Sequence, residues 1–183
     1  MAETTTPADV RLICGMISAD EALFAQALER LQHEFGPADI VSDVMDFDFT
    51  HYYDGQMGSL LKRQFVSFAR PTKPDALAAA KVLTNNIEAD FAARLGSPDL
   101  PPRPINLDPG YVDQAKLVLA STKDFSHRIY LGSGVFGEIT LLYHKGRWDA
   151  LGWTFPDYAS PRYHPFLTQV RSALRKYIEE HRQ

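Results

Sequence analysis

The order of helical and extended patterns is the feature of this sequence that most limits its fold. Apolar side chains recur at helical spacing in two early stretches, 23–35 and 77–95, and each stretch follows a strand-like segment. In the second half, β-branched and aromatic residues gather in four short runs, at 116–120, 127–131, 136–143 and 148–155. Strands and helices therefore do not alternate as a doubly wound parallel sheet requires. We predict an α+β fold with three main helices and a largely antiparallel sheet.

The remaining segments complete this pattern. A last helix is expected from 165 to about 181, and extended segments are expected at 10–17, 38–42, 45–50 and 61–68. The helix at 77–95 carries the clearest stripe, because its apolar residues lie 3, 3, 4, 4 and 4 positions apart until Gly96 stops it. The first part thus has the order strand, helix, strand, strand, helix, strand, which is that of a ferredoxin-like split β-α-β unit. We expect later hairpins, with turns at 132–134 and 144–146, to extend its sheet.

Length and composition indicate one globular domain. The chain has 183 residues, and a typical domain has about 150. Hydrophobic residues make up 45% and charged residues 23%, which is close to the average of folded domains and excludes a disordered or fibrous chain. Residues 1–9 are small, polar and include a proline. We therefore expect a flexible N-terminal tail at 1–9 and a single α+β domain at 10–183.

The charge balance and the cysteine content limit the partners and the compartment. The chain has 19 basic and 23 acidic residues, and this net charge of −4 argues against binding to nucleic acid or to an anionic membrane. The single cysteine, Cys14, excludes an intramolecular disulfide and a cysteine-rich zinc site. The sequence shows neither a leader pattern nor an apolar run of about 18 residues. We expect a cytoplasmic protein without membrane association.

The richest polar segment is the loop 120–128, which lies between two expected strands. Its cations and hydroxyl groups suit an anion, and its histidine can exchange a proton near neutral pH. The alternative is an ordinary surface turn in which Asp124 pairs with one of the two cations. The ligand-binding candidates of this loop are Ser121, Thr122, Lys123, Ser126, His127 and Arg128.

Two further segments carry polar residues that could line the same site. Lys81, Asn85 and Glu88 fall at i, i+4 and i+7 on the flank of the apolar helix stripe, where a solvated row of side chains is the alternative. The segment 106–111 is interpreted as an Asp-Pro-Gly turn at the sheet edge, and an ordinary loop is the alternative. From this segment the ligand-binding candidates are Asn106 and Tyr111.

Carboxylates and one imidazole supply the candidates for metal binding and catalysis. In a strand over 45–50, Asp46 and Asp48 share one face, and two such carboxylates can hold Mg²⁺ beside a phosphate. The alternative is a strand with one solvated face. The candidates for acid–base chemistry are His127, Asp108 and Glu138, and the sequence leaves open whether any reaction is catalysed.

Several familiar motifs are incomplete. The run 131–137, LGSGVFG, is typical of a kinase glycine-rich loop, but no HRD or DFG element accompanies it. The run 121–124, STKD, is similar to a guanine-reading element, but no phosphate-binding P-loop is present. Zinc protease and serine hydrolase motifs are also absent from the sequence. These enzyme classes are therefore not supported.

Six runs distributed along the chain resemble one bacterial family of unknown function, DUF4416. They are FTHYY with MG at 49–58, KVLTN with IE at 81–88, NLDPGY at 106–111, LASTKDFSHRIYL at 119–131, EITL at 138–141 and WTFPDY at 153–158. The resemblance covers nearly the whole chain from Val10. It implies no established activity, because the GTP-binding name that some members carry is an automatic one. The sequence departs from the family pattern at Gln56, where Glu is expected, and at Gly137, where Ala is usual.

Two functions from different classes follow from these observations. The first is binding of a small anionic or phosphorylated ligand, with nucleotides among the candidates, at a cleft at the sheet edge. The second is a non-enzymatic protein-interaction module with an aromatic surface patch of Tyr52, Tyr53, Trp153 and Tyr158.

Overall fold

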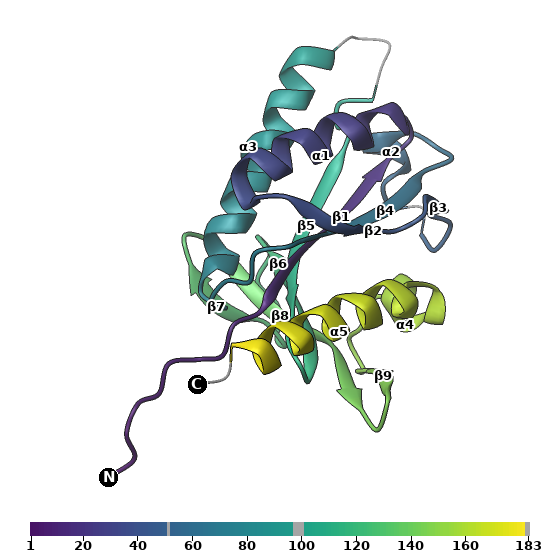
Figure 1. Ribbon diagram of the computed structural model, residues 1–183. Coiled ribbons are helices and arrows are strands. Elements are labelled where there is room, and N and C mark those ends of the chain that lie inside the picture. Colours follow the sequence, from purple (N-terminus) through teal and green to yellow (C-terminus); the bar gives the residue numbers. More distant parts are fainter. Residues whose placement is uncertain (51, 97–100, 182–183) are drawn as a thin grey trace.

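The computed structural model, which describes residues 1–50, 52–96 and 101–181, contains mixed helices and strands in the predicted α+β arrangement (Figure 1). The elements in chain order are β1 (Arg11–Ser18), α1 (Ala22–Phe35), β2 (Ala38–Val41), β3 (Met45–Asp46), α2 (Asp54–Met57), β4 (Lys62–Phe68), α3 (Ala76–Leu95), β5 (Asn106–Val112), β6 (Lys116–Ser121), β7 (Ile129–Gly132), β8 (Val135–His144), β9 (Arg147–Ala150), α4 (Pro156–Ala159), the 3-10 helix η1 (Pro161–Tyr163) and α5 (His164–Glu180).

Within the described residues, nine strands form one antiparallel sheet. Its order is β2-β4-β1-β5-β6-β8-β7, with β3 paired to β4 and β9 paired to β8. The first four strands of this order have α1 between β1 and β2, and α3 between β4 and β5. Each helical connection therefore skips one strand position, which is the topology of a ferredoxin-like split β-α-β unit. The hairpins that follow extend the sheet on the β5 side, as the sequence predicts.

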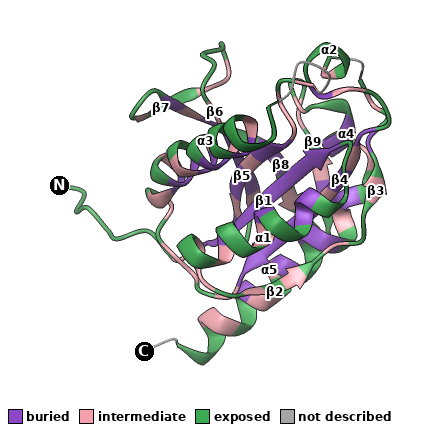
Figure 2. Cartoon of the chain, turned by 90° about the horizontal axis from the view of Figure 1, so that it is seen from above, coloured by how far each residue is buried: buried purple, intermediate pink, exposed green. Residues whose placement is uncertain are grey.

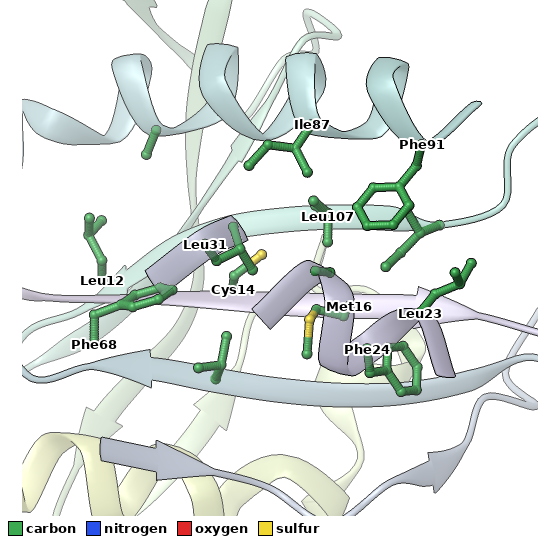
Figure 3. Packing of buried hydrophobic residues seen from close by; sticks show 14 residues of the cluster. Leu12, Cys14, Met16, Leu23, Phe24, Leu31, Phe68, Ile87, Phe91 and Leu107 are labelled. Carbon is green, nitrogen blue, oxygen red and sulfur yellow. The ribbon is translucent and has the colours of Figure 1, made fainter. Parts of the chain in front are cut away.

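Helices cover both faces of the sheet. Helices α1 and α3 lie on one face and α5 lies on the other, here named the α1/α3 face and the α5 face (Figure 1). Figure 2 shows that the central strands are buried between these layers, whereas the outer surfaces of the helices are exposed. Two-residue alternation divides the central strand β1 between two cores. Leu12, Cys14 and Met16 pack under α1 and α3 (Figure 3), and Ile13 packs under α5.

Both predicted hairpin turns are present. The turn between β7 and β8 places Ser133 and Gly134 at φ angles of 54° and 73°. The turn between β8 and β9 places Lys145 and Gly146 at 48° and 86°. Two central residues with positive φ are the signature of a type I′ turn, whose twist matches that of the flanking strands.

The interpretation of 106–111 as a turn is wrong, because these residues belong to β5, a strand next to the centre of the sheet. Proline lacks the N–H group that a strand with two neighbours needs. Pro109 is tolerated because β6 pairs with β5 only from Gly110 onward. Gly110 is required for close approach, since a Cβ atom there would lie 2.6 Å from the carbonyl oxygen of Val118.

Two other extended segments are shorter than expected. Only Met45 and Asp46 of the segment 45–50 pair with β4, so Asp46 and Asp48 do not share the face of one strand. The run 148–155 leaves the sheet after Ala150 and leads into the short helix α4, which the sequence analysis did not predict.

The N-terminal tail joins the domain at Val10, which forms a bridge with Thr72. Just before it, the Asp9 carboxylate accepts from the Lys73 ammonium over 2.6 Å. No helix within the described ranges combines the length and the hydropathy that crossing a membrane requires.

Candidate functional site

Most of the predicted polar residues lie at one end of the sheet, in two clusters. Adjacent strands run antiparallel, so the end of β1 lies beside the starts of β4 and β5, and the end of β6 lies beside the start of β8. The pairing Gly15 to Asp108 and the pairing Leu119 to Glu138 place both carboxylates on the α5 face, together with Ser121. Residues from distant parts of the sequence are thus brought to one region, here named the polar end.

Glu138 is the centre of the first cluster at the polar end. Its side chain is 1% exposed, and its Oε2 atom accepts from Arg128 Nε at 2.7 Å and lies 3.0 Å from His127 Nε2. Arg128 also donates to the Ser121 hydroxyl and to the carbonyl oxygen of Lys123. These bonds hold the 121–128 loop against β8. We name Ser121, Lys123, His127, Arg128 and Glu138 the Glu138 network.

The imidazole of His127 is fixed by a second contact. Its ring stacks on the Trp153 indole with centroids 5.2 Å apart and planes 8° apart. Phe125 lies against the ring from another direction, at 5.1 Å. Trp153 Nε1 in turn donates to the carbonyl oxygen of Ile139 over 2.8 Å. A carboxylate and an aromatic stack therefore hold the histidine in one orientation, which sequence spacing does not reveal.

Lys123 is the exposed cation of this network. Its ammonium donates to the phenol oxygen of Tyr52 over 2.6 Å and lies 5.0 Å from the centre of that ring. The hydrogen bond and the charge of Lys123 lower the pKa of Tyr52. Within the residues that the structure describes, no carboxylate lies within ion-pair distance of Lys123, and Glu138 rather than Asp124 pairs with Arg128. The predicted pairing of Asp124 with one of these cations is therefore wrong, whereas the turn itself is present, because the Lys123 N–H donates to the Ser121 hydroxyl over 3.1 Å.

The second cluster, here named the Asp108 network, lies at the start of β5. Because β6 does not pair with this part of β5, the backbone of Leu107 is open to α3. Lys81 donates to the Leu107 carbonyl oxygen over 2.9 Å, and the Leu107 N–H donates to Glu88 over 2.7 Å. The members of the network are Lys81, Glu88, Arg103, Asn106 and Asp108.

Further polar contacts close the Asp108 network. The Asn106 amide donates to Asp108 over 2.6 Å and accepts from Arg103. Arg103 also pairs with Glu88 over 2.7 Å. Burial raises the pKa of Glu88, although Lys81 and Arg103 act in the opposite direction. The cluster thus provides hydrogen-bond partners for the open backbone of Leu107 and pairs its own cations with its carboxylates.

A buried arginine, which the sequence analysis missed, lies beside this network. Arg63 is 1% exposed, its Nη2 atom donates to the Tyr158 phenol oxygen over 2.6 Å, and its Nη1 atom lies 3.5 Å from Asp108. Its guanidinium also lies within 6 Å of the ring centres of Phe47, Phe65, Tyr158 and Tyr163. The available signal was strand alternation, which places Arg63 on the same face as the apolar Phe65.

The segment that holds Tyr52 and Tyr53 connects the two networks. The two rings form an edge contact at 5.1 Å. Tyr52 reaches Lys123, whereas burial raises the pKa of Tyr53 to about 12, with Asp108 raising it further and Arg63 and Arg103 lowering it. Tyr53 therefore lies within the electrostatic reach of the Asp108 network. The same segment also contacts the Asp108 network directly, because the Arg103 N–H donates to the carbonyl oxygen of Gln56 over 3.0 Å.

Other candidates lie elsewhere or are already paired. Tyr111 packs in the clusters of the α1/α3 face. It lies three positions after Asp108 in β5, so strand alternation places the two side chains on opposite faces of the sheet. Asn85 is half-buried on α3, and Thr122 and Ser126 are exposed on the loop. Tyr158 is 3% exposed, so its predicted place in a surface patch is wrong.

The magnesium candidates are each bound to a cation. Asp46 accepts from Lys62 over 2.7 Å, and Asp48 accepts from Arg162 over 2.9 Å, which lowers the pKa of Asp48. In the described part of the chain, no three metal-ligating side chains gather at one point. A depression of about 500 Å³ lies on the α1/α3 face, lined among others by Leu12, Phe35 and Arg70, and the predicted residues do not line it.

This fold and this polar end define a small α+β protein with a ferredoxin-like core and a two-network polar surface at one end of its sheet. The chain belongs to the family described as domain of unknown function DUF4416, whose model matches residues 8–174. Comparisons with curated proteins and with solved structures gave no significant match.

Proposed function

We propose that this protein binds a small anionic ligand, such as a phosphorylated metabolite, at the polar end, with Lys123 as the principal contact. The observation that carries the proposal is that the exposed Lys123 ammonium is held by a neutral phenol and not by a carboxylate. A cation held in this way keeps its charge for a ligand, because no carboxylate of the described residues pairs with it.

The neighbouring groups define what such a ligand would meet. The hydroxyls of Thr122 and Ser126 lie on the same exposed loop and can donate to ligand oxygens. Arg128 and His127 instead fix the conformation of the loop, because both side chains already contact the Glu138 carboxylate. The Trp153 indole, which is 42% exposed, offers an apolar surface next to the loop. The proposed ligand therefore combines a negative group with a less polar part.

The test is a binding experiment with a matched control. Pyrophosphate, sugar phosphates and nucleoside monophosphates are titrated up to about 10 mM, with and without Mg²⁺, and followed by thermal shift, since a ligand at about 100 times its dissociation constant adds about 2.7 kcal/mol. We expect Lys123→Ala to weaken the binding of an active probe at least tenfold. Lys176→Ala, which changes an exposed lysine on α5, should leave binding unchanged. Equal binding by Lys123→Ala would contradict the proposal.

A second candidate function, protein interaction through aromatic side chains, is favoured by the exposure of Tyr52 and Trp153, at 62% and 42%. It predicts that none of the small anions binds and that Tyr52→Ala and Trp153→Ala weaken capture of one specific partner without lowering the melting temperature. Binding of a small anion that depends on Lys123 would favour the first function instead.

A further inference from the structure

The imidazole of His127 has one ring nitrogen that the Glu138 network does not use. Its Nε2 atom lies 3.0 Å from Glu138 Oε2, and the same oxygen accepts from Arg128 Nε over 2.7 Å. An ionised carboxylate can only accept hydrogen bonds, so the proton of the neutral ring lies on Nε2. Nδ1 therefore carries an unshared electron pair, and a histidine in this form can take up a proton.

The Nδ1 atom is accessible to solvent, although most of the ring is covered. The side chain of His127 is 13% exposed. Nδ1 makes no hydrogen bond to a described residue, and it is not one of the described polar atoms that are fully buried without a partner. A water molecule or a hydroxyl group of a ligand can therefore reach this nitrogen.

The surroundings of the ring stabilise the positive charge that proton uptake creates. The buried Glu138 carboxylate contacts Nε2, and its other oxygen, Oε1, has no partner among the described residues. Its negative charge favours an imidazolium. The Trp153 indole, stacked at 5.2 Å with planes 8° apart, presents its electron-rich face to the ring. Arg128 acts in the opposite direction, because its guanidinium shares the same carboxylate oxygen.

We propose that His127 is a general base that takes up a proton through Nδ1, and that Glu138 is its positioning residue. Glu138 fixes the tautomer, and the stack on Trp153 fixes the plane of the ring, so the electron pair of Nδ1 has a constant direction. This inference adds proton transfer to a surface for which binding alone was proposed.

The proton donor is a hydroxyl group or a water molecule beside the negative group of the bound ligand. This substrate class rests on the proposed function, because Lys123, which would hold that group, belongs to the same loop as His127. In the step, the O–H bond breaks and the proton moves to Nδ1. The oxygen keeps the electron pair and becomes a stronger nucleophile.

The first test is nitrogen NMR of the histidine rings in the full chain, which shows which ring nitrogen carries the proton. His127, assigned by comparison with His127→Gln, should be in the Nε2–H form at about pH 8, where a neutral ring is expected. The control is His144, which is exposed and makes no hydrogen bond to a described residue, so it should show both tautomers. A proton on Nδ1 of His127 would overturn the proposal.

The second test uses 5-nitrobenzisoxazole, an uncharged compound from which a base removes a carbon-bound proton. The N–O bond then breaks, and a coloured cyanophenolate forms without a co-reactant. The wild type should catalyse this reaction at least tenfold faster than free imidazole at the same concentration. His127→Gln should lose this excess rate, Glu138→Gln should lose most of it, and His144→Gln should keep it. Because the probe has no charge, its reaction is independent of the anion contact of Lys123.

The outcomes separate this inference from the proposed function. Failure of every anion to bind, with an excess rate that depends on His127, would contradict only the binding site. A wild-type rate equal to that of free imidazole would overturn the general base, as would an excess rate that His127→Gln retains. Circular dichroism melting shows whether each variant folds. If Glu138→Gln does not fold, Glu138→Asp replaces it and should also lower the rate, because the shorter carboxylate no longer reaches Nε2.

Discussion

Arg63 and Tyr158 lie 95 positions apart in the sequence and meet on the α5 face of the sheet, where the guanidinium donates to the phenol oxygen over 2.6 Å. The arginine comes from β4 and the tyrosine from the short helix α4. The pair joins the segment after β9 to the centre of the sheet, and both side chains are buried. Burial also raises the pKa of Tyr158 well above its usual value, so the phenol stays neutral beside the cation.

Removing the acceptor of this pair should destabilise the fold. Tyr158→Phe leaves Arg63 Nη2 without its 2.6 Å partner in a site where Arg63 Nε already has none. A buried donor without a partner costs about 1–3 kcal/mol, so we expect that loss in the free energy of unfolding by urea. Tyr177→Phe, at the end of α5, is the control and should cost less than about 0.5 kcal/mol. Equal losses in both variants would contradict this assignment.

The contact between Lys123 and Tyr52 should be visible in the ionisation of tyrosine. The hydrogen bond and the charge of Lys123 lower the pKa of Tyr52. We expect Lys123→Ala to raise that pKa, which ultraviolet difference titration of the phenolate band detects. Subtracting the titration of Tyr52→Phe isolates the signal of this one ring. A Tyr52 titration that is identical with and without Lys123 would show that the contact is absent in solution.

Glu88 should make part of the stability depend on pH. Burial raises its pKa in the folded protein above that of the unfolded chain, so the folded state binds this proton more tightly. The stabilising contribution is fully present below the unfolded pKa of about 4.3 and is lost as the pH rises through the folded pKa. We expect the stability of the wild type relative to Glu88→Gln to fall as the pH rises above about 4.3 and through the folded pKa. The control Asp90→Asn changes an exposed carboxyl group of the same helix, and the same trend in both comparisons would contradict the assignment to Glu88.

Gly110 should tolerate no side chain. A Cβ atom there would lie 2.6 Å from the backbone oxygen of Val118, and backbone cannot move aside as a flexible side chain can. Gly110→Ala should therefore cost about 1–3 kcal/mol, measured by urea unfolding. Gly55→Ala is the matched control, because no atom lies within 4 Å of its Cβ position in helix α2. Similar stability of the two variants would mean that β5 and β6 separate more easily than their pairing indicates.

The fold could be predicted where local pattern and tertiary environment agree. The stripe of α3 was predictable because that face of the helix is buried from Leu77 to Phe91, and each type I′ turn has a glycine at its second central position, where φ is positive. Strand β5 was missed because Pro109 and Gly110 are turn residues by local preference. A strand tolerates them because β6 does not pair with β5 at Pro109 and because Val118 of β6 approaches Gly110 closely. Both features depend on the tertiary structure and leave no local signal in the sequence.

The candidate site was predictable in its residues but not in its pairings. Sequence spacing singled out Glu138, His127 and Arg128, yet the shared carboxylate oxygen depends on how β8 and the loop meet. Tyr111 was misplaced for the same reason, because interpreting 106–111 as a turn removed the strand alternation that puts it on the other face. Arg103 was hidden in a proline-rich stretch that gives no periodic signal.

The contacts of Lys81 and Glu88 with Leu107 give α3 the role of a neighbouring strand along the open part of β5. Both backbone groups of a single residue are engaged by side chains that lie two helical turns apart. A slip of the helix by one residue would break both bonds at once. These two bonds therefore fix the position of α3 along β5.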